Sequence, residues 1–428
     1  GWNFGLASTW IGLGNAFIGS LLAWSVLGRR TRVMTQHLNS KTMPDFFEKR
    51  YDSKTLKIIA SFIVFVFLIP YTASLYNGLS SLFNNVFEIP YAVIVIIMAV
   101  LTGIYVIFGG YMATAINDFI QGIIMLVGIV AVIAAVLNEN GGFTQAVTSL
   151  SSEAGPEFVS LFGPNPIFLF FVVMLTSLGT WGLPQMVGKF YSIKDEGSIK
   201  KGTIISTFFA IIVAGGCYFL GGFGRLYKEE MVAGGYISET GNVMFDKVVP
   251  TILSDLAPVI VALVIVLVLS ASMSTLSSLV MTSSSTLTLD VIKGSIAKKM
   301  DEKKQLLWMR LLIVFFIVIS VVIALDPPAF IAQLMGISWG ALAGAFLAPF
   351  LYGLYWKGVT KASVWASFAA GVGITVANMF FKFIASPINA GAFCMLAGLV
   401  IVPIVSVLTK APEKSIIDGA FSCYDRKV

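Results

Sequence analysis

The sequence predicts an all-α polytopic membrane protein, and three observations support this fold class. Of its 428 residues, 57% are hydrophobic and only 12% are charged, and the mean hydropathy is +0.89. Soluble globular domains of this length do not have such a composition. Apolar runs recur along the chain, each long enough to cross about 30 Å of hydrocarbon as a helix of roughly 20 residues. Basic residues are concentrated in alternate connections between these runs.

Eleven apolar segments meet the length criterion, and the positive-inside rule tests that count. One set of alternate connections, together with the C-terminal end, holds 24 of the 28 lysine and arginine residues. This segregation predicts eleven helices, with the basic set and the C-terminus cytoplasmic and Gly1 outside. The segments lie at about 3–27, 56–80, 87–113, 115–137, 166–190, 202–224, 251–288, 307–325, 329–355, 362–383 and 390–408.

We interpret residues 1–410 as a single transmembrane transporter domain and residues 411–428 as a short cytoplasmic tail. The three cysteines have no metal or redox spacing, and the single histidine lies in a basic loop. No phosphate-binding glycine loop ending in Lys-Ser/Thr is found, and no nucleophile pairs with a base. The sequence therefore predicts no enzyme, no ATP-driven pump and no organic cofactor.

A hydroxyl-rich stretch, Leu269–Asp290, stands at a depth where a membrane helix is expected to be apolar. Helical geometry gathers its small and hydroxyl side chains within about a third of the circumference. Hydroxyl oxygens can coordinate a hard cation such as Na⁺. They can equally serve helix packing by hydrogen-bonding a carbonyl one turn back. The stretch alone leaves both interpretations open for Ala271, Ser274, Thr275, Ser278, Thr282 and Ser285.

Two segments contain glycine and proline at membrane depth, Thr176–Phe190 and Leu334–Phe350, and we interpret both as interrupted. Broken helices at mid-membrane indicate a transporter site, although Gly and Pro are also common in ordinary membrane helices. Trp181 and Trp339 lie inside these segments and are candidate walls for a solute.

Asp118 is the clearest candidate for an intramembrane charge. Its carboxylate could balance a cation held by hydroxyls, or cap the start of a helix. Tyr105 could hydrogen-bond a solute, or pack as an ordinary aromatic side chain.

Four motifs in order resemble the sodium/solute symporter family, which includes transporters of proline, pantothenate, sugars and sialic acid. Gly28–Tyr51 resembles the first cytoplasmic loop with its Pro-Asp-aromatic-aromatic core. Ile104–Gly122 is similar to the Gly-Gly signature followed by Asp-x-x-Gln, and Leu183–Asp195 to the proline-containing turn with a basic-aromatic pair. Ser270–Ser278 resembles the ion-binding helix. The resemblance covers nearly the whole chain.

The resemblance implies a leucine-transporter-like fold of two inverted five-helix repeats. Core helices two to five would lie at about 3–137, the second repeat at about 166–355, and accessory helices at about 362–408. Because Gly1–Leu27 resembles the second core helix, we expect the first core helix, which supplies further carbonyl ligands, to be missing from this chain.

The resemblance further implies sodium-coupled symport of a small organic solute across the cytoplasmic membrane by alternating access. The sodium site would use the Ala271 carbonyl with Ser274 and Thr275, and a second cation site, present in some members, would use Ser277, Ser278 and Asp118. Thr282 and Ser285 match no family ligand, which favours packing for both. The residues expected around the solute are Tyr105, Thr176, Thr180, Trp181, Gln185 and Trp339.

The chain also departs from family patterns. Leu183 replaces the asparagine of sugar-transporting members, and Thr176 and Thr180 align with the aromatic pair expected of a proline transporter. Both departures count against a sugar and against proline as the solute, and we expect another small anionic or zwitterionic organic solute. Two alternatives stay open: a solute-sensing module of a signalling system, and proton coupling through Asp118. The expected partners are the solute and the lipid bilayer, with no nucleic acid, and the oligomeric state is undetermined.

Overall fold

The computed structural model describes residues 1–254, 256–297, 299–328 and 330–424, with side chains except at 85, 110–114 and 295. The last four residues of the expected tail therefore lie outside the described residues. Within the described residues the elements are helices, and extended pairing is limited to an isolated bridge between Ile237 and Val243. Ten helical stretches and one bent pair are long and apolar enough to cross a membrane. The predicted all-α fold class and the eleven segments are thus confirmed.

The first span, Gly5–His37, combines α1 (Thr9–Gly14) and α2 (Arg29–His37) with π-helical turns between them at Asn15–Leu22 and Trp24–Gly28. Helix α5 (Tyr91–Glu139) holds two spans, Tyr91–Gly109 and Ala115–Glu139. The other membrane helices are α4 (Lys54–Phe87), α7 (Pro166–Ser177), α8 (Pro184–Tyr191), α9 (Glu196–Gly221), α12 (Pro258–Thr286), α13 (Glu302–Leu325), α14 (Ile331–Tyr355), α15 (Lys361–Phe381) and α16 (Pro387–Leu408).

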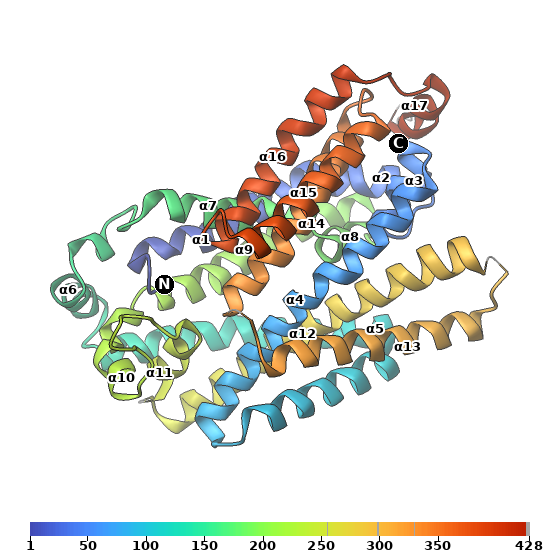
Figure 1. The fold of residues 1–428 in the computed structure, drawn as a ribbon. Coiled ribbons are helices and arrows are strands. Elements are labelled where there is room, and N and C mark those ends of the chain that lie inside the picture. The colour runs from blue at the N-terminus through green and yellow to red at the C-terminus, as the bar shows by residue number, and fades with distance from the viewer. Residues whose placement is uncertain (255, 298, 329, 425–428) are drawn as a thin grey trace.

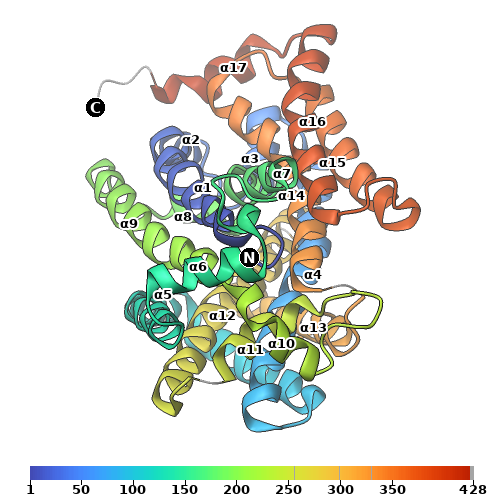
Figure 2. The same ribbon diagram turned by 90° about the vertical axis from the view of Figure 1, so that its left-hand side faces the viewer.

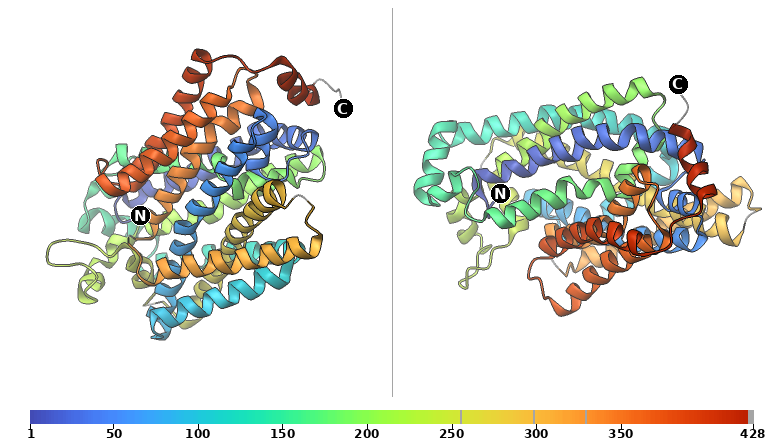
Figure 3. Two further views of the ribbon diagram at one scale, coloured as in Figure 1. Left: turned by 45° about the vertical axis from the view of Figure 1, so that its right-hand side comes forward. Right: turned by 90° about the horizontal axis from the view of Figure 1, so that it is seen from above.

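Short helices gather at the two ends of this bundle (Figure 1). One end carries α6 (Phe143–Glu153), α10 (Lys228–Ala233) and α11 (Val248–Ser254), near the N-terminus. The opposite end carries α3 (Met43–Tyr51) and α17 (Lys414–Phe421). Figure 2 looks onto the first end, and Figure 3 shows the long helices running alongside one another between the two ends. The loops predicted to share a side of the membrane thus lie together.

Helix α14 forms the centre of the main core, where it packs against α4, α15 and α16. The interruption expected at Leu334–Phe350 is wrong, because α14 is one continuous helix that includes Pro349. Its glycines instead allow close helix approach: a Cβ added at Gly340 would lie 2.5 Å from the Cα of Gly391 in α16. Small residues at helix contacts are the usual route to tight packing inside a membrane.

The other expected interruption, in Thr176–Phe190, is confirmed. Helix α7 ends at Ser177, a 3₁₀ turn spans Gly179–Gly182, and α8 begins at Pro184, with the two parts bent by 44°. Proline has no N–H to continue the ladder of α7, but it suits the first turn of a new helix. A Cβ at Gly182 would lie 2.8 Å from the backbone nitrogen of Leu347, so the turn presses directly against α14.

Candidate functional site

Two cavities lie along the broken α7–α8 segment. The apolar cavity, of about 240 Å³, is lined by Thr176 at the end of α7 and Trp339 of α14, with mainly apolar neighbours. The polar cavity, of about 730 Å³, is larger and is lined from α5, α8 and α12. Its charged and polar lining includes Asp118, Gln185, Lys189, Ser277, Ser278, Thr282 and Ser285.

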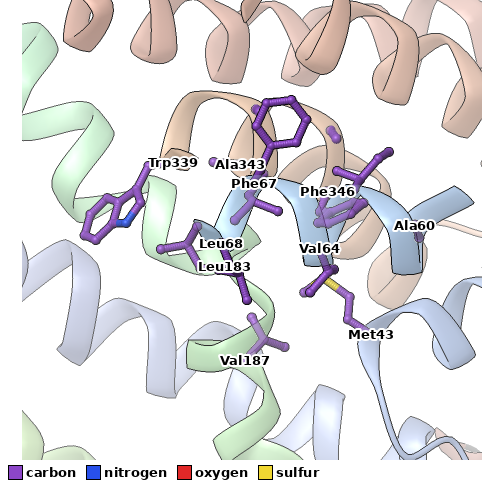
Figure 4. Packing of buried hydrophobic residues seen from close by; sticks show 14 of the residues in the cluster. Met43, Ala60, Val64, Phe67, Leu68, Leu183, Val187, Trp339, Ala343 and Phe346 are labelled. Carbon is purple, nitrogen blue, oxygen red and sulfur yellow. The ribbon is translucent and has the colours of Figure 1, made fainter. Parts of the chain in front are cut away.

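A buried layer stands between the cavities along this segment. Trp181 and Leu183 are 7% and 0% exposed, and Trp181 donates its indole N–H to the carbonyl of Ile18 at 3.0 Å. Figure 4 shows Leu183 beside Leu68 of α4, with Trp339 and Val187 in the same cluster. The chain therefore passes from the apolar cavity through a closed turn to the polar cavity.

The hydroxyl ladder of α12 is the more open face of that helix. Ala271, Ser274 and Thr275 are half-buried, whereas Leu276 and Leu279 are fully buried. The Thr275 hydroxyl donates to the Ala271 carbonyl at 2.9 Å. This is the one-turn-back bond of the packing interpretation, and it also places two of the expected sodium ligands side by side.

Asp118 of α5 faces this ladder. The Ser274 hydroxyl lies beside its carboxylate, and its Oδ1 is buried without a hydrogen-bond partner. It shares the polar cavity with Ser277 and Ser278. Asp118 lies in the first turn of the second span of α5, Ala115–Glu139, so a first-turn carboxylate favoured by the helix dipole stays open beside the cation interpretation. A carboxylate beside hydroxyl oxygens gives the donor set that a hard cation prefers.

The lower rungs of the ladder, Thr282 and Ser285, were expected to serve helix packing, and the Ser285 hydroxyl donates to the Thr282 carbonyl at 3.3 Å. Both side chains are also half-buried and line the polar cavity. The ladder therefore continues into open space past Ser278. Within the described part of the chain, no group of three His, Cys, Asp or Glu side chains is placed to hold a metal.

The six residues expected around the solute are not gathered in one cavity. Thr176 and Trp339 line the apolar cavity, and Gln185 lines the polar one. Thr180 and Trp181 lie in the turn between them.

The hydrogen bonding of these six residues also differs. Thr176 donates to the Val172 carbonyl at 2.8 Å, and Thr180 donates to the Ser177 carbonyl at 2.7 Å. The Trp339 indole N–H and both amide atoms of Gln185 are buried without partners.

Tyr105 lines neither of the two cavities. Its hydroxyl accepts a hydrogen bond from the Asn117 amide at 3.0 Å. Since Tyr105 and Asn117 belong to the two different spans of α5, this bond ties those spans together next to Asp118.

Sequence reasoning missed Lys189 as a site residue. It lies on α8, lines the polar cavity and interacts electrostatically with Asp118, although no direct ion pair joins them in the described structure. The sequence analysis placed it among the cytoplasmic basic residues and in the basic-aromatic pair of the Leu183–Asp195 motif, but assigned it no role in binding. Its place in the interrupted segment was the available signal.

A charged cluster at the α3 end was also missed. Lys57 pairs with Asp45 at 2.9 Å and Glu48 at 2.7 Å, and Thr42 donates to the buried Asp290 at 2.6 Å. Burial acts to raise the pKa of Asp45, but hydrogen bonds from Lys57 and Lys49 outweigh it and hold that pKa below its usual value. The cluster joins α3, α4 and the π-helical end of α12 at Leu287–Ile296.

Comparisons with known proteins agree with this arrangement. A model of the sodium:solute symporter family matches residues 1–371, so the chain belongs to that family. It is 26% identical over 418 residues to the osmoregulated proline transporter of Bacillus subtilis (strain 168), covering 96% of this chain and 83% of that protein. It is 29% identical over 422 residues to a sodium/proline symporter of Staphylococcus aureus, covering 95% of this chain and 80% of that protein.

Solved structures share the fold. A Na⁺-coupled sialic acid symporter aligns with a TM-score of 0.69 at 15% identity, covering 96% of this chain and 91% of that one. The nucleobase-cation-symport transporter Mhp1 aligns with a TM-score of 0.51 at 12% identity, covering 98% and 95%. The leucine-transporter-like fold is thereby confirmed, and the chain is a multi-pass membrane protein of a symporter family.

Proposed function

We propose that this protein carries out sodium-coupled symport of a small zwitterionic or anionic organic solute. The observation that carries the proposal is the juxtaposition of the Asp118 carboxylate with the Ser274 hydroxyl on the open face of α12. Ala271, Ser274 and Thr275 would bind the coupling Na⁺, and Asp118 with Ser277 and Ser278 would bind a second cation. Family membership supports Na⁺ as the coupling ion.

The solute class follows from the polar cavity. Gln185 offers an amide donor and an amide acceptor, both without partners, and Lys189 offers a positive charge in the same space. A solute with a carboxylate and a polar or ammonium group would pair with these side chains. The proline transporters among the relatives make imino and amino acids the first solutes to try.

Alternating access would use the buried turn between the cavities. In this proposal the polar cavity faces the cytoplasm, because it lies on the same side as the basic loops, and the C-terminus is cytoplasmic as well. Na⁺ drives transport only if it binds the outward-facing state more tightly than the inward-facing state, since equal affinity shifts no equilibrium. Repacking of Trp181 and Leu183 against α14 would open one cavity and close the other.

Uptake by the full-length protein in proteoliposomes tests the proposal. We expect accumulation of proline or another zwitterionic amino acid under an inward Na⁺ gradient, and its loss in Ser274→Ala with Thr275→Ala. The matched control is Ser283→Ala with Ser284→Ala, two buried hydroxyls of the same helix that line neither cavity. Uptake that follows a pH gradient without Na⁺, or saturable solute binding without transport, would contradict the proposal and support proton coupling or sensing instead.

A further inference from the structure

Arg50, at the end of α3, is a buried cation without a counter-charge. Its side chain is 0% exposed, and none of the carboxylates that the structure describes lies within ion-pair distance of it. Its Nε donates to the Gly353 carbonyl at 2.9 Å and its Nη2 to the Trp356 carbonyl at 3.1 Å. Its Nη1 is buried with no partner.

Aromatic rings compensate this charge only in part. The guanidinium carbon lies 5.0 Å from the ring centre of Tyr51 and 4.9 Å from that of Phe421 in α17. Such contacts are worth less than the cost of burying a charge that has no ionic partner. Burial lowers the pKa of Arg50, as expected for a cation in this position. An anion bound near Arg50 would therefore compensate its charge.

A cavity of about 330 Å³ adjoins Arg50 and carries further donors. Lys361 and Lys410 line it, together with the first turn of α15, whose Thr360 side chain caps the N–H of Ser363 at 3.2 Å. An N-terminal helix turn attracts anions because its N–H groups point outward and its dipole is positive there. The acidic groups of the cavity are Asp52, which lies 3.7 Å from Lys361 and is largely exposed, and the exposed Glu413.

We propose that this cavity, enclosed by α3, α15, α16 and α17, binds a phosphate-type anion through Lys361 and Lys410, with the buried charge of Arg50 beside the cavity attracting the anion. The anion is either the headgroup of an acidic phospholipid or a soluble phosphate compound. The site lies away from both transport cavities, so it does not depend on the proposed solute or on Na⁺ coupling.

The end of α16 favours the lipid as the source. Val407 and Leu408 are 75% and 78% exposed and immediately precede Thr409 and Lys410 of the cavity. Exposed apolar side chains on a membrane helix are in contact with acyl chains, so a headgroup in the cavity would continue into lipid along α16. Basic side chains at a membrane surface each favour acidic lipid.

Thermal unfolding of the purified full-length protein tests the site with three probes: phosphatidylglycerol, phosphatidylcholine and inorganic phosphate. We expect phosphatidylglycerol to raise the unfolding temperature relative to phosphatidylcholine, and native mass spectrometry to detect it as a retained adduct. Stabilisation by inorganic phosphate in phosphatidylcholine would keep the site and identify a soluble anion as the source.

Three variants make the test specific. Lys361→Gln with Lys410→Gln changes only exposed side chains and is expected to weaken binding of phosphatidylglycerol about tenfold. Lys200→Gln with Lys414→Gln removes the same charge from exposed positions outside the cavity and should leave binding unchanged. Arg50→Gln removes the buried charge and should also weaken binding of phosphatidylglycerol, and its unfolding temperature in phosphatidylcholine shows whether the variant is folded. Equal responses of the cavity variant and the control, or no stabilisation by either anion, would overturn the proposal.

Discussion

The two cavities along the α7–α8 segment differ in what their polar atoms have left to bind. In the polar cavity, Asp118 keeps one carboxylate oxygen free and Gln185 keeps its whole amide free. In the apolar cavity the Thr176 hydroxyl is already bonded to a helix carbonyl, and the Trp339 indole N–H is the unpartnered donor among the candidates discussed. The unpartnered polar atoms of these candidates are therefore concentrated in the polar cavity, and the apolar cavity offers mainly apolar side chains.

The largest expected effect comes from removing the charge of the polar cavity. Asp118→Asn should raise the Na⁺ concentration for half-maximal uptake roughly a hundredfold, because a cation bound in a membrane interior loses its counter-charge. Asp326→Asn, at an exposed position, is the control. An unchanged Na⁺ dependence would remove Asp118 from the cation site and weaken the contrast between the cavities.

The buried turn that separates the cavities should tolerate little added volume. Gly182→Ala is expected to lower the free energy of unfolding by about 2 kcal/mol, since the new Cβ would press on the backbone of α14. Gly188→Ala, where nothing lies within 4 Å of an added Cβ, should be neutral or slightly stabilising. Thermal unfolding of the two variants in detergent measures both. Equal destabilisation of the two variants would show that the turn at Gly182 is packed no more tightly than the helix at Gly188.

Recognition should weaken more from the polar side than from the apolar side. Gln185→Leu is expected to raise the KM for solute about tenfold, because a buried amide that binds solute is worth about 1.5 kcal/mol. Thr176→Val should change KM less than about twofold, since its hydroxyl already donates within α7. Initial uptake rates at saturating Na⁺ separate the two. The reverse order would place the solute in the apolar cavity.

The smallest effect concerns the fixed charge near Asp118. Lys189→Gln should lower the Na⁺ concentration for half-maximal uptake by up to about fivefold, because a cation near Asp118 competes with Na⁺ and such exposed pairs are worth at most about 1 kcal/mol. Lys194→Gln, a basic position that does not line the cavity, serves as the comparison. Weaker Na⁺ dependence in Lys189→Gln would indicate that Lys189 orients Asp118 rather than competing at it.

The sequence predicted one broken helix well and one badly, for a physical reason. In Thr176–Phe190, α7 ends at Ser177, a glycine-containing 3₁₀ turn follows, and Pro184, which has no N–H, begins α8. In Leu334–Phe350, Pro349 stays within α14 and the glycines serve contacts with α15 and α16. Glycine permits a break and a close helix contact equally, and only the neighbours decide between them.

Composition and charge pattern alone determined the helical membrane fold, the number of spans and the segregation of the loops, because hydrocarbon thickness and backbone hydrogen bonding allow few alternatives. Motif order indicated the family, and spacing on one helix identified the hydroxyl ladder. Which side of the buried turn each candidate occupies was decided by tertiary structure. Lys189 lies near Asp118, and Arg50 is buried without a counter-charge, because helices distant in sequence pack together at both places. The local sequence pattern does not predict such packing.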